Sequence, residues 1–140
     1  MKDEIIDKIN KLTTWYRDNS YKCDINKLLD FQDKLCTLLF NLSDLYSEFS
    51  QNYNLSYIQR KYDFATNKMN FRNTNKNVSD CENLAEIEAK EQREIEVKYY
   101  EIAQKLNLLR QDARLLIQLC TQRISHLKHE SEYSKIQNQT

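Results

Sequence analysis

The sequence predicts an all-α, single-domain protein: a long antiparallel helical hairpin, coiled-coil-like, with a short N-terminal helix that completes a three-helix bundle at the base. The 140 residues include neither glycine nor proline, whereas average usage would give about ten and about seven. Both residues punctuate turns and loops, so strand-rich folds are disfavoured and glycine-dependent nucleotide-binding loops are excluded. In addition, apolar residues recur at helical spacing along most of the chain.

The first predicted helix covers residues 1–18. Ile5, Ile9 and Trp15 recur there at the spacing of one helix face. Two acidic residues near its start suit a helix N-terminus, where the helix dipole favours negative charge. The polar segment DNSYKCD (18–24) is expected to connect this helix to the next one.

The second predicted helix covers residues 24–72. Its main apolar stripe repeats every seven residues, as in a coiled coil, and consists of Leu28, Leu35, Leu42 and Phe49. A second stripe lies about a quarter-turn away, and the first helix is expected to cover it; its members are Leu29, Cys36 and Phe40. The segment NYNLS (52–56) leaves two alternatives open: one continuous helix, or a break with Ser56 capping a new helix.

The third predicted helix covers residues 79–130. The loop before it, RNTNKNVSD (72–80), is rich in asparagine, which tolerates left-handed conformations better than most residues. Ser79 followed by Glu82 has the pattern of a capping box. A seven-residue repeat then runs through Tyr99, Leu106, Ala113, Cys120 and Leu127. Residues 131–140 form a polar tail that is expected to fray.

A turn near residue 75 would fold the two long helices onto each other. This register brings Leu42 near Leu109 and Leu28 near Ile124. It also brings together segments of opposite charge, because residues 53–79 carry +4 (five basic, one acidic) and residues 80–101 carry −5 (three basic, eight acidic). We therefore expect ion pairs across the hairpin close to its turn, although each surface pair is weak.

The stretch YNLSYIQRKYDFATNKMNF (53–71) carries two apolar faces. One face continues the main stripe of the hairpin and consists of Tyr53, Tyr57, Phe64 and Phe71. The opposite face has coiled-coil spacing and consists of Leu55, Ile58, Tyr62, Ala65 and Met69. One hairpin partner covers only one of these faces. The other is therefore expected to be an interface with a protein partner or a second copy, unless a broken helix turns both faces toward one core.

Basic residues near the aromatic ones raise the alternative of nucleic-acid binding. Base stacking on Tyr53 or Tyr57 would place phosphates beside Arg60 and Lys61. Arg110 and Arg114 contribute to a second basic patch, on a segment (102–140) that carries +3. These four basic residues are candidates for contacts with phosphates or with an acidic partner. A formal net charge of zero disfavours a general polyanion binder.

No pattern of catalytic, cofactor-binding or metal-binding residues stands out, so we expect a protein that is not an enzyme. The four cysteines form no CxxC pair, and the expected state is four reduced, mostly buried thiols. His126 and His129 are three residues apart and lack the further ligands that zinc requires. The chain shows no signal peptide and no apolar run long enough for a membrane span, which favours a cytoplasmic location.

Several segments resemble a family of small all-helical accessory proteins of tailed bacteriophages, encoded near replication and recombination genes. They are YIQRKYDFA, SDCENLAEIEA, VKYYEIAQKLNLLR and TQRISHLKHE, which together span a little over half of the chain, residues 57–130. Family members often carry glycine in the turn, where this chain has asparagine. The resemblance implies a helical hairpin, a phage origin, the host bacterial cytoplasm as location and a non-catalytic accessory role, with no catalytic residues to carry over.

Three functional hypotheses follow. The first is a phage-type interaction protein that binds a protein partner and self-associates, acting in phage replication or recombination. The second is an anti-defence protein that inhibits a host immune complex or sequesters a nucleotide signal. The third is a single-stranded nucleic-acid binder.

Overall fold

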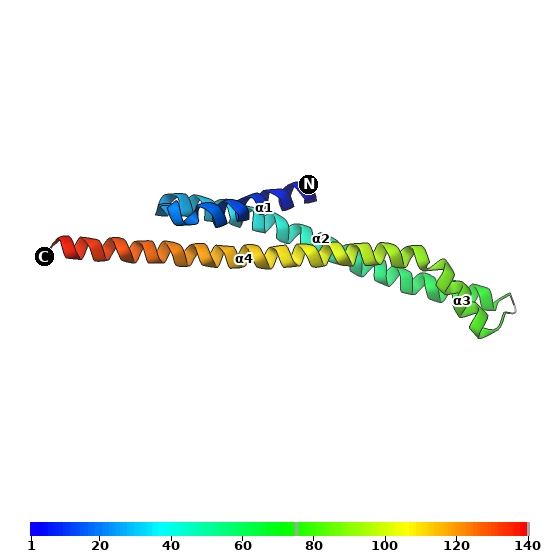
Figure 1. Ribbon diagram of the computed structural model, residues 1–140. Helices are drawn as coiled ribbons and strands as arrows, with labels where there is room; N and C mark the ends of the chain where they lie inside the picture. Colours follow the sequence, from blue (N-terminus) through cyan, green and yellow to red (C-terminus); the bar gives the residue numbers. More distant parts are fainter. Residues whose placement is uncertain (75, 140) are drawn as a thin grey trace. The chain divides into compact units, whose positions relative to one another are not determined.

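The computed structural model describes residues 1–74 and 76–139, and each regular element in these ranges is helical. Helix α1 (Lys2–Asn19) is followed by a short 3-10 helix, η1 (Ser20–Lys22), and by the long helix α2 (Ile25–Arg72). Helix α3 (Val78–Glu88) and the long helix α4 (Lys90–Asn138) complete the chain (Figure 1). The prediction of an all-α fold with a long helical hairpin is confirmed, and α2 and α4 are its two long members.

The chain divides into two compact units, through both of which α2 and α4 run. The terminal unit consists of Met1–Leu45 and Leu106–Thr140, and the hairpin unit consists of Tyr46–Lys105. The predicted centre of the turn, residue 75, lies outside the described residues. Each unit is described by itself below.

The terminal unit has an apolar core that follows the predicted heptad stripe. Leu28, Leu35 and Leu42 of α2 are fully buried, and Leu106 and Cys120 of α4 are buried with them. The Cys120 thiol donates a hydrogen bond to the Leu28 carbonyl oxygen at 3.4 Å, which ties the two helices together. Burial raises the pKa of this thiol, so it stays protonated at a higher pH than an exposed cysteine.

Helix α1 packs on α2 through aromatic side chains. The rings of Trp15 and Tyr16 stack on Phe31, with centroid distances of 5.5 Å and 5.0 Å. The prediction that the first helix covers Leu29, Cys36 and Phe40 is wrong, because Leu29 is 44% exposed and Phe40 is 75% exposed. Phe40 follows Phe31 by nine residues, which places the two on opposite sides of α2. A helix that docks on Phe31 therefore leaves Phe40 in solvent.

Helix α2 is continuous through residues 52–56, so the alternative of a break in the NYNLS segment is wrong. No residue in that segment lacks a backbone N–H donor, and Ser56 lies half-buried within the helix instead of capping a new one. At its other end α2 begins where predicted. The Asp24 carboxylate accepts a hydrogen bond from the Lys27 N–H at 2.8 Å, as a helix cap does.

The return segment differs from the prediction at both ends. The helix cap is Asn77, whose side-chain oxygen accepts from the Asp80 N–H at 2.8 Å, so the predicted capping box at Ser79 is wrong. At the far end α4 continues to Asn138, so residues 131–138 are helical where a frayed tail was expected. No glycine or proline ends the helix there, and its glutamate, lysine and glutamine residues favour the helical state.

The return segment is also two helices, where one was predicted over residues 79–130. Ala89 separates α3 from α4, with φ −81° and ψ −5°. Backbone hydrogen bonds continue on both sides of it, because the Ala89 N–H donates to Ala85 and the Arg93 N–H donates to Ala89, each at 3.0 Å. The bend visible in Figure 1 thus comes from one ψ angle near zero, which no residue type in the sequence marks.

Candidate interaction surface

The two sides of the hairpin unit meet along a seam of small, polar and aromatic side chains. On the return side the seam is lined by Cys81, Ala85 and Ala89, of which the first two are 0% exposed and the third 2% exposed. These residues are four apart, so they lie on one side of α3 and let the opposite backbone approach closely. On α2 the seam is lined by polar residues at core-facing positions, among them Arg60 and Asp63.

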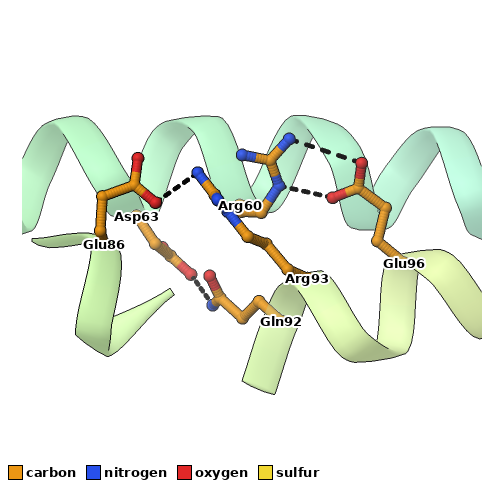
Figure 2. A network of polar contacts seen from close by, with 6 residues as sticks. All are labelled: Arg60, Asp63, Glu86, Gln92, Arg93 and Glu96. Atoms are coloured by element: carbon orange, nitrogen blue, oxygen red, sulfur yellow. Dashed lines mark hydrogen bonds and ion pairs between the residues drawn. The ribbon is translucent and has the colours of Figure 1, made fainter. Parts of the chain in front are cut away.

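An ion pair between Arg60 of α2 and Glu96 of α4 crosses the seam. The guanidinium donates to both carboxylate oxygens, from Nε to Oε2 and from Nη2 to Oε1 at 3.4 Å (Figure 2). The two side chains are only 13% and 12% exposed. The hydrogen bond that Arg60 donates to Glu96 raises the pKa of Arg60, so the guanidinium stays charged. A two-pronged contact of this kind fixes orientation as well as contributing energy.

A second polar contact lies beside this pair. The Asp63 carboxylate accepts hydrogen bonds from Gln92 of α4 and, at 2.9 Å, from Gln59 of its own helix. Arg93 forms an ion pair with Glu86 across the bend between α3 and α4 (Figure 2). The charged side chains of the seam therefore have partners within the hairpin unit.

Ion pairing across the hairpin was predicted from the charges of residues 53–79 and 80–101, and it is confirmed. Besides Arg60 and Glu96, Lys68 of α2 contacts Glu82 of α3 at 2.8 Å. Aromatic contacts of the first predicted apolar face occur in the same unit. Tyr53 lies against Tyr100 with ring centroids 5.3 Å apart, while Tyr57 remains 41% exposed.

The second predicted apolar face points away from the seam. We call it the outer face, and it consists of Leu55, Ile58, Tyr62, Ala65 and Met69. Its four large members are 57%, 62%, 68% and 67% exposed, in sequence order. In the hairpin unit, the outer side of α2 therefore exposes large apolar side chains, while Phe64 and Phe71 on its other side are half-buried. A contiguous patch of this kind marks an interaction surface more often than a simple solvent-facing side.

The outer face borders a groove that reaches α4. The groove has a volume of about 500 Å³ and is lined by Leu55, Ser56, Ile58 and Gln59 of α2 and by Gln92 and Ile95 of α4. Ile95 is 49% exposed, so the apolar surface extends from α2 onto α4. The groove is large enough to accept an apolar side chain from a helix that lies along the outer face.

The predicted basic candidates fall into different environments. Arg60 belongs to the seam and is held by Glu96, whereas Lys61 is exposed beside it. Both cationic groups approach the Tyr57 ring, at 5.4 Å and 5.5 Å from its centroid. Arg110 is half-buried in the terminal unit and donates to the Asn107 side chain at 3.0 Å, and Arg114 of that unit is exposed.

Sequence reasoning missed the return side of the seam and the part of the groove on α4. The missed residues are Cys81, Ala85, Ala89, Gln92, Ile95 and Glu96. The four-residue spacing of the small residues was a usable signal, because it places them on one helix side. The partner of Arg60 carried no such signal, because Glu96 sits among several similar carboxylates.

Other groups with reactive side chains have ordinary helix-surface or core environments. His126 lies beside Glu130, one helical turn away, at 3.1 Å. The four cysteines are free thiols, and Cys23, Cys81 and Cys120 are buried. Within residues 1–74 and 76–139, no group of three or more histidine, cysteine or acidic side chains is arranged to hold a metal ion. None of the helices described has an apolar stretch long enough to cross a membrane.

No protein-family model matches the chain, and no significant match was found among curated proteins or solved structures.

Proposed function

We propose that this protein is a non-catalytic helical interaction module, and that the outer face of the hairpin unit is its binding surface for other proteins. The observation that carries the proposal is the row of exposed large apolar side chains on α2, opposite the side that pairs with α4. An ion pair lies in the seam at 13% and 12% exposure, while Leu55, Ile58, Tyr62 and Met69 are more than half exposed. A protein partner that covers this face would bury its apolar side chains.

The free energy available from burial of apolar side chains supports this role. Full burial of one large apolar side chain stabilises a structure by about 1.5–3 kcal/mol. The outer face holds four such side chains at coiled-coil spacing, which is the spacing that packs against another helix. A few well-covered side chains of this kind supply most of the energy of a typical interface. A phage accessory role in replication or recombination, as the resemblance implies, would be carried out through this face.

Direct binding of single-stranded nucleic acid is supported less well. The Arg60 guanidinium, which was one of its candidate contacts, is engaged by Glu96 in the seam. Between residues 52 and 72 of α2, the exposed basic residues are Lys61 and Arg72, which are too few for a basic groove. The whole chain has a formal net charge of zero. Grooves that bind single-stranded nucleic acid combine aromatic rings, on which bases stack, with a continuous row of basic side chains.

Cross-linking of the tagged full chain in its native cell tests the proposal. Ile58→Ser with Tyr62→Ser removes two exposed apolar side chains from the outer face, and both changes should leave the helical content unchanged. We expect this variant to lose the cross-linked protein partners of the wild type. Phe40→Ser is the matched control, because Phe40 is 75% exposed in the terminal unit. Partners that persist in the outer-face variant, or that vanish equally in the control, would contradict the proposal.

A further inference from the structure

We infer that the partner of the outer face is an acidic amphipathic helix of another protein. This inference rests on the proposed function and adds the chemistry of the partner. Its basis is the charge of the residues that border the outer face, together with the shape of the surface.

The exposed charges that α2 itself places along the outer face are basic. Between residues 52 and 72, α2 carries four basic residues and one acidic one. The acidic residue, Asp63, points into the seam and is bonded to Gln92. Arg60 is also in the seam, and its charge is matched by Glu96. Lys68 is half-buried, and its charge is matched by Glu82 of α3 at 2.8 Å. Lys61 and Arg72 are the exposed charges of this segment that remain.

The spacing of these residues places them beside the apolar positions. If Leu55, Tyr62 and Met69 take the first position of successive heptads, Lys61 and Lys68 take the last position, which flanks the contact in helix pairs. The opposite flank holds Gln59 and Thr66, which are uncharged. A helix that packs on this face therefore meets Lys61 and the Lys68–Glu82 pair on one side and neutral polar groups on the other.

These charges disfavour the same α2 face of a second copy as the occupant and favour an acidic helix. The same α2 face of a second copy would bring lysine against lysine in an antiparallel pair and lysine against neutral groups in a parallel pair. Neither arrangement gains electrostatic attraction. A helix with glutamate or aspartate beside its apolar stripe would place opposite charges beside Lys61 and Arg72. This attraction favours association and selects the partner.

The shape of the surface fits the same occupant. An amphipathic helix lays its apolar face along a groove and anchors it with side chains one turn apart. The groove beside Leu55 and Ile58, with Ile95 as its far wall, offers one such anchor position of about 500 Å³. The remaining outer-face side chains, Tyr62 and Met69, extend the contact toward the end of α2.

Binding of two matched synthetic peptides to the full chain tests the inference. Both peptides have three heptads with leucine at the a and d positions, and they carry either glutamate or lysine at the e and g positions. We expect the glutamate peptide to bind at least about tenfold more tightly than the lysine peptide, and its affinity to fall as salt is added. Fluorescence anisotropy at two salt concentrations measures both effects.

Charge reversal on the protein gives the matched control. Lys61→Glu with Arg72→Glu should weaken binding of the glutamate peptide by about tenfold or more. Lys11→Glu with Lys27→Glu changes the net charge equally at exposed positions of the terminal unit and should leave the affinity within about twofold. Equal loss in both variants, equal binding of both peptides, or no binding of the glutamate peptide overturns the inference.

Self-association is a further outcome of the same experiment. A dimer of the wild-type chain that resists the glutamate peptide, measured by sedimentation, would make a second copy the occupant and overturn the inference. Failure of this inference can be distinguished from failure of the proposed function. If outer-face-dependent partners are cross-linked in cells while the glutamate peptide does not bind, only the partner's chemistry is wrong.

Discussion

The two units of this protein use the same helices to bury side chains of different size. In the terminal unit the fully buried side chains include Leu28, Leu35 and Leu42, which are 0% exposed. In the hairpin unit the side chains at 0% exposure are those of Cys81 and Ala85. Large apolar side chains of that unit, such as Ile58 and Tyr62, are exposed, while Phe64 and Phe71 are half-buried. The terminal unit has a core of fully buried leucines, and the described residues of the hairpin unit include no buried leucine.

This difference indicates that stability comes mainly from the terminal unit and that the register of the two helices is fixed in the hairpin unit. Apolar burial in the terminal unit supplies free energy without strong directionality. The Arg60–Glu96 pair supplies direction, because its two hydrogen bonds form only when α2 and α4 are in one register. A buried ion pair contributes little net stability, since desolvation offsets its attraction. We therefore expect the hairpin unit to be well defined in register and only weakly stable by itself.

Matched leucine truncations in the two units should give the largest contrast. Leu35→Ala removes a fully buried side chain and should lower the free energy of unfolding by about 2–5 kcal/mol. Leu55→Ala makes the same chemical change at 57% exposure and should cost less than about 0.5 kcal/mol. Urea denaturation of both variants, without a partner, measures the contrast. Similar costs at the two positions would show that the outer face is already covered in the free protein.

Removal of one member of the seam ion pair should have the next largest effect. Arg60→Ala leaves the Glu96 carboxylate largely buried without its partner and should cost about 2 kcal/mol. Replacing both residues by leucine removes the isolated charge, so the double variant should lie within about 1 kcal/mol of the wild type. Thermal and urea unfolding of the two variants provide the comparison. A double variant as unstable as the single one would show that the pair itself is a major source of stability.

The helix cap at the start of α3 should have the smallest effect. Asn77→Ala removes the side-chain oxygen that accepts from the Asp80 N–H and should cost about 1 kcal/mol. Ser79→Ala is the control, because Ser79 lies inside α3 and should change the stability by less than about 0.5 kcal/mol. Urea unfolding curves of the two variants measure which substitution lowers the free energy of unfolding more. The reverse ranking would restore the capping box that the sequence predicted.

Periodicity made the helices and the two faces of residues 53–71 predictable. The stripe of Leu28, Leu35 and Leu42 identified the core of the terminal unit, because one helix face must be buried for a hairpin to form. The opposite orientation of the outer face followed from the same geometry. Its exposure agrees with expectation, and its role as an interface stays a prediction.

Other features depend on contacts that periodicity does not encode. The docking of α1 on Phe31 instead of Phe40 is decided by which aromatic rings fit together, and both residues had similar patterns in the sequence. The bend at Ala89 is a single ψ angle at a residue type that favours helices. The pairing of Arg60 with Glu96 depends on the relative rotation of two helices, and the carboxylate-rich return segment offered several equivalent partners.

Hydrogen exchange of the free chain tests most directly whether the hairpin unit is less stable than the terminal unit. Amides of α2 between residues 28 and 45 should exchange only through global unfolding, because they belong to the apolar core. Amides between residues 55 and 69 should open locally and exchange about 100-fold faster or more, a difference of about 2.7 kcal/mol. Equal protection of the two segments at low concentration would contradict the account, because it would mean that the polar seam stabilises its helices as well as the apolar core does.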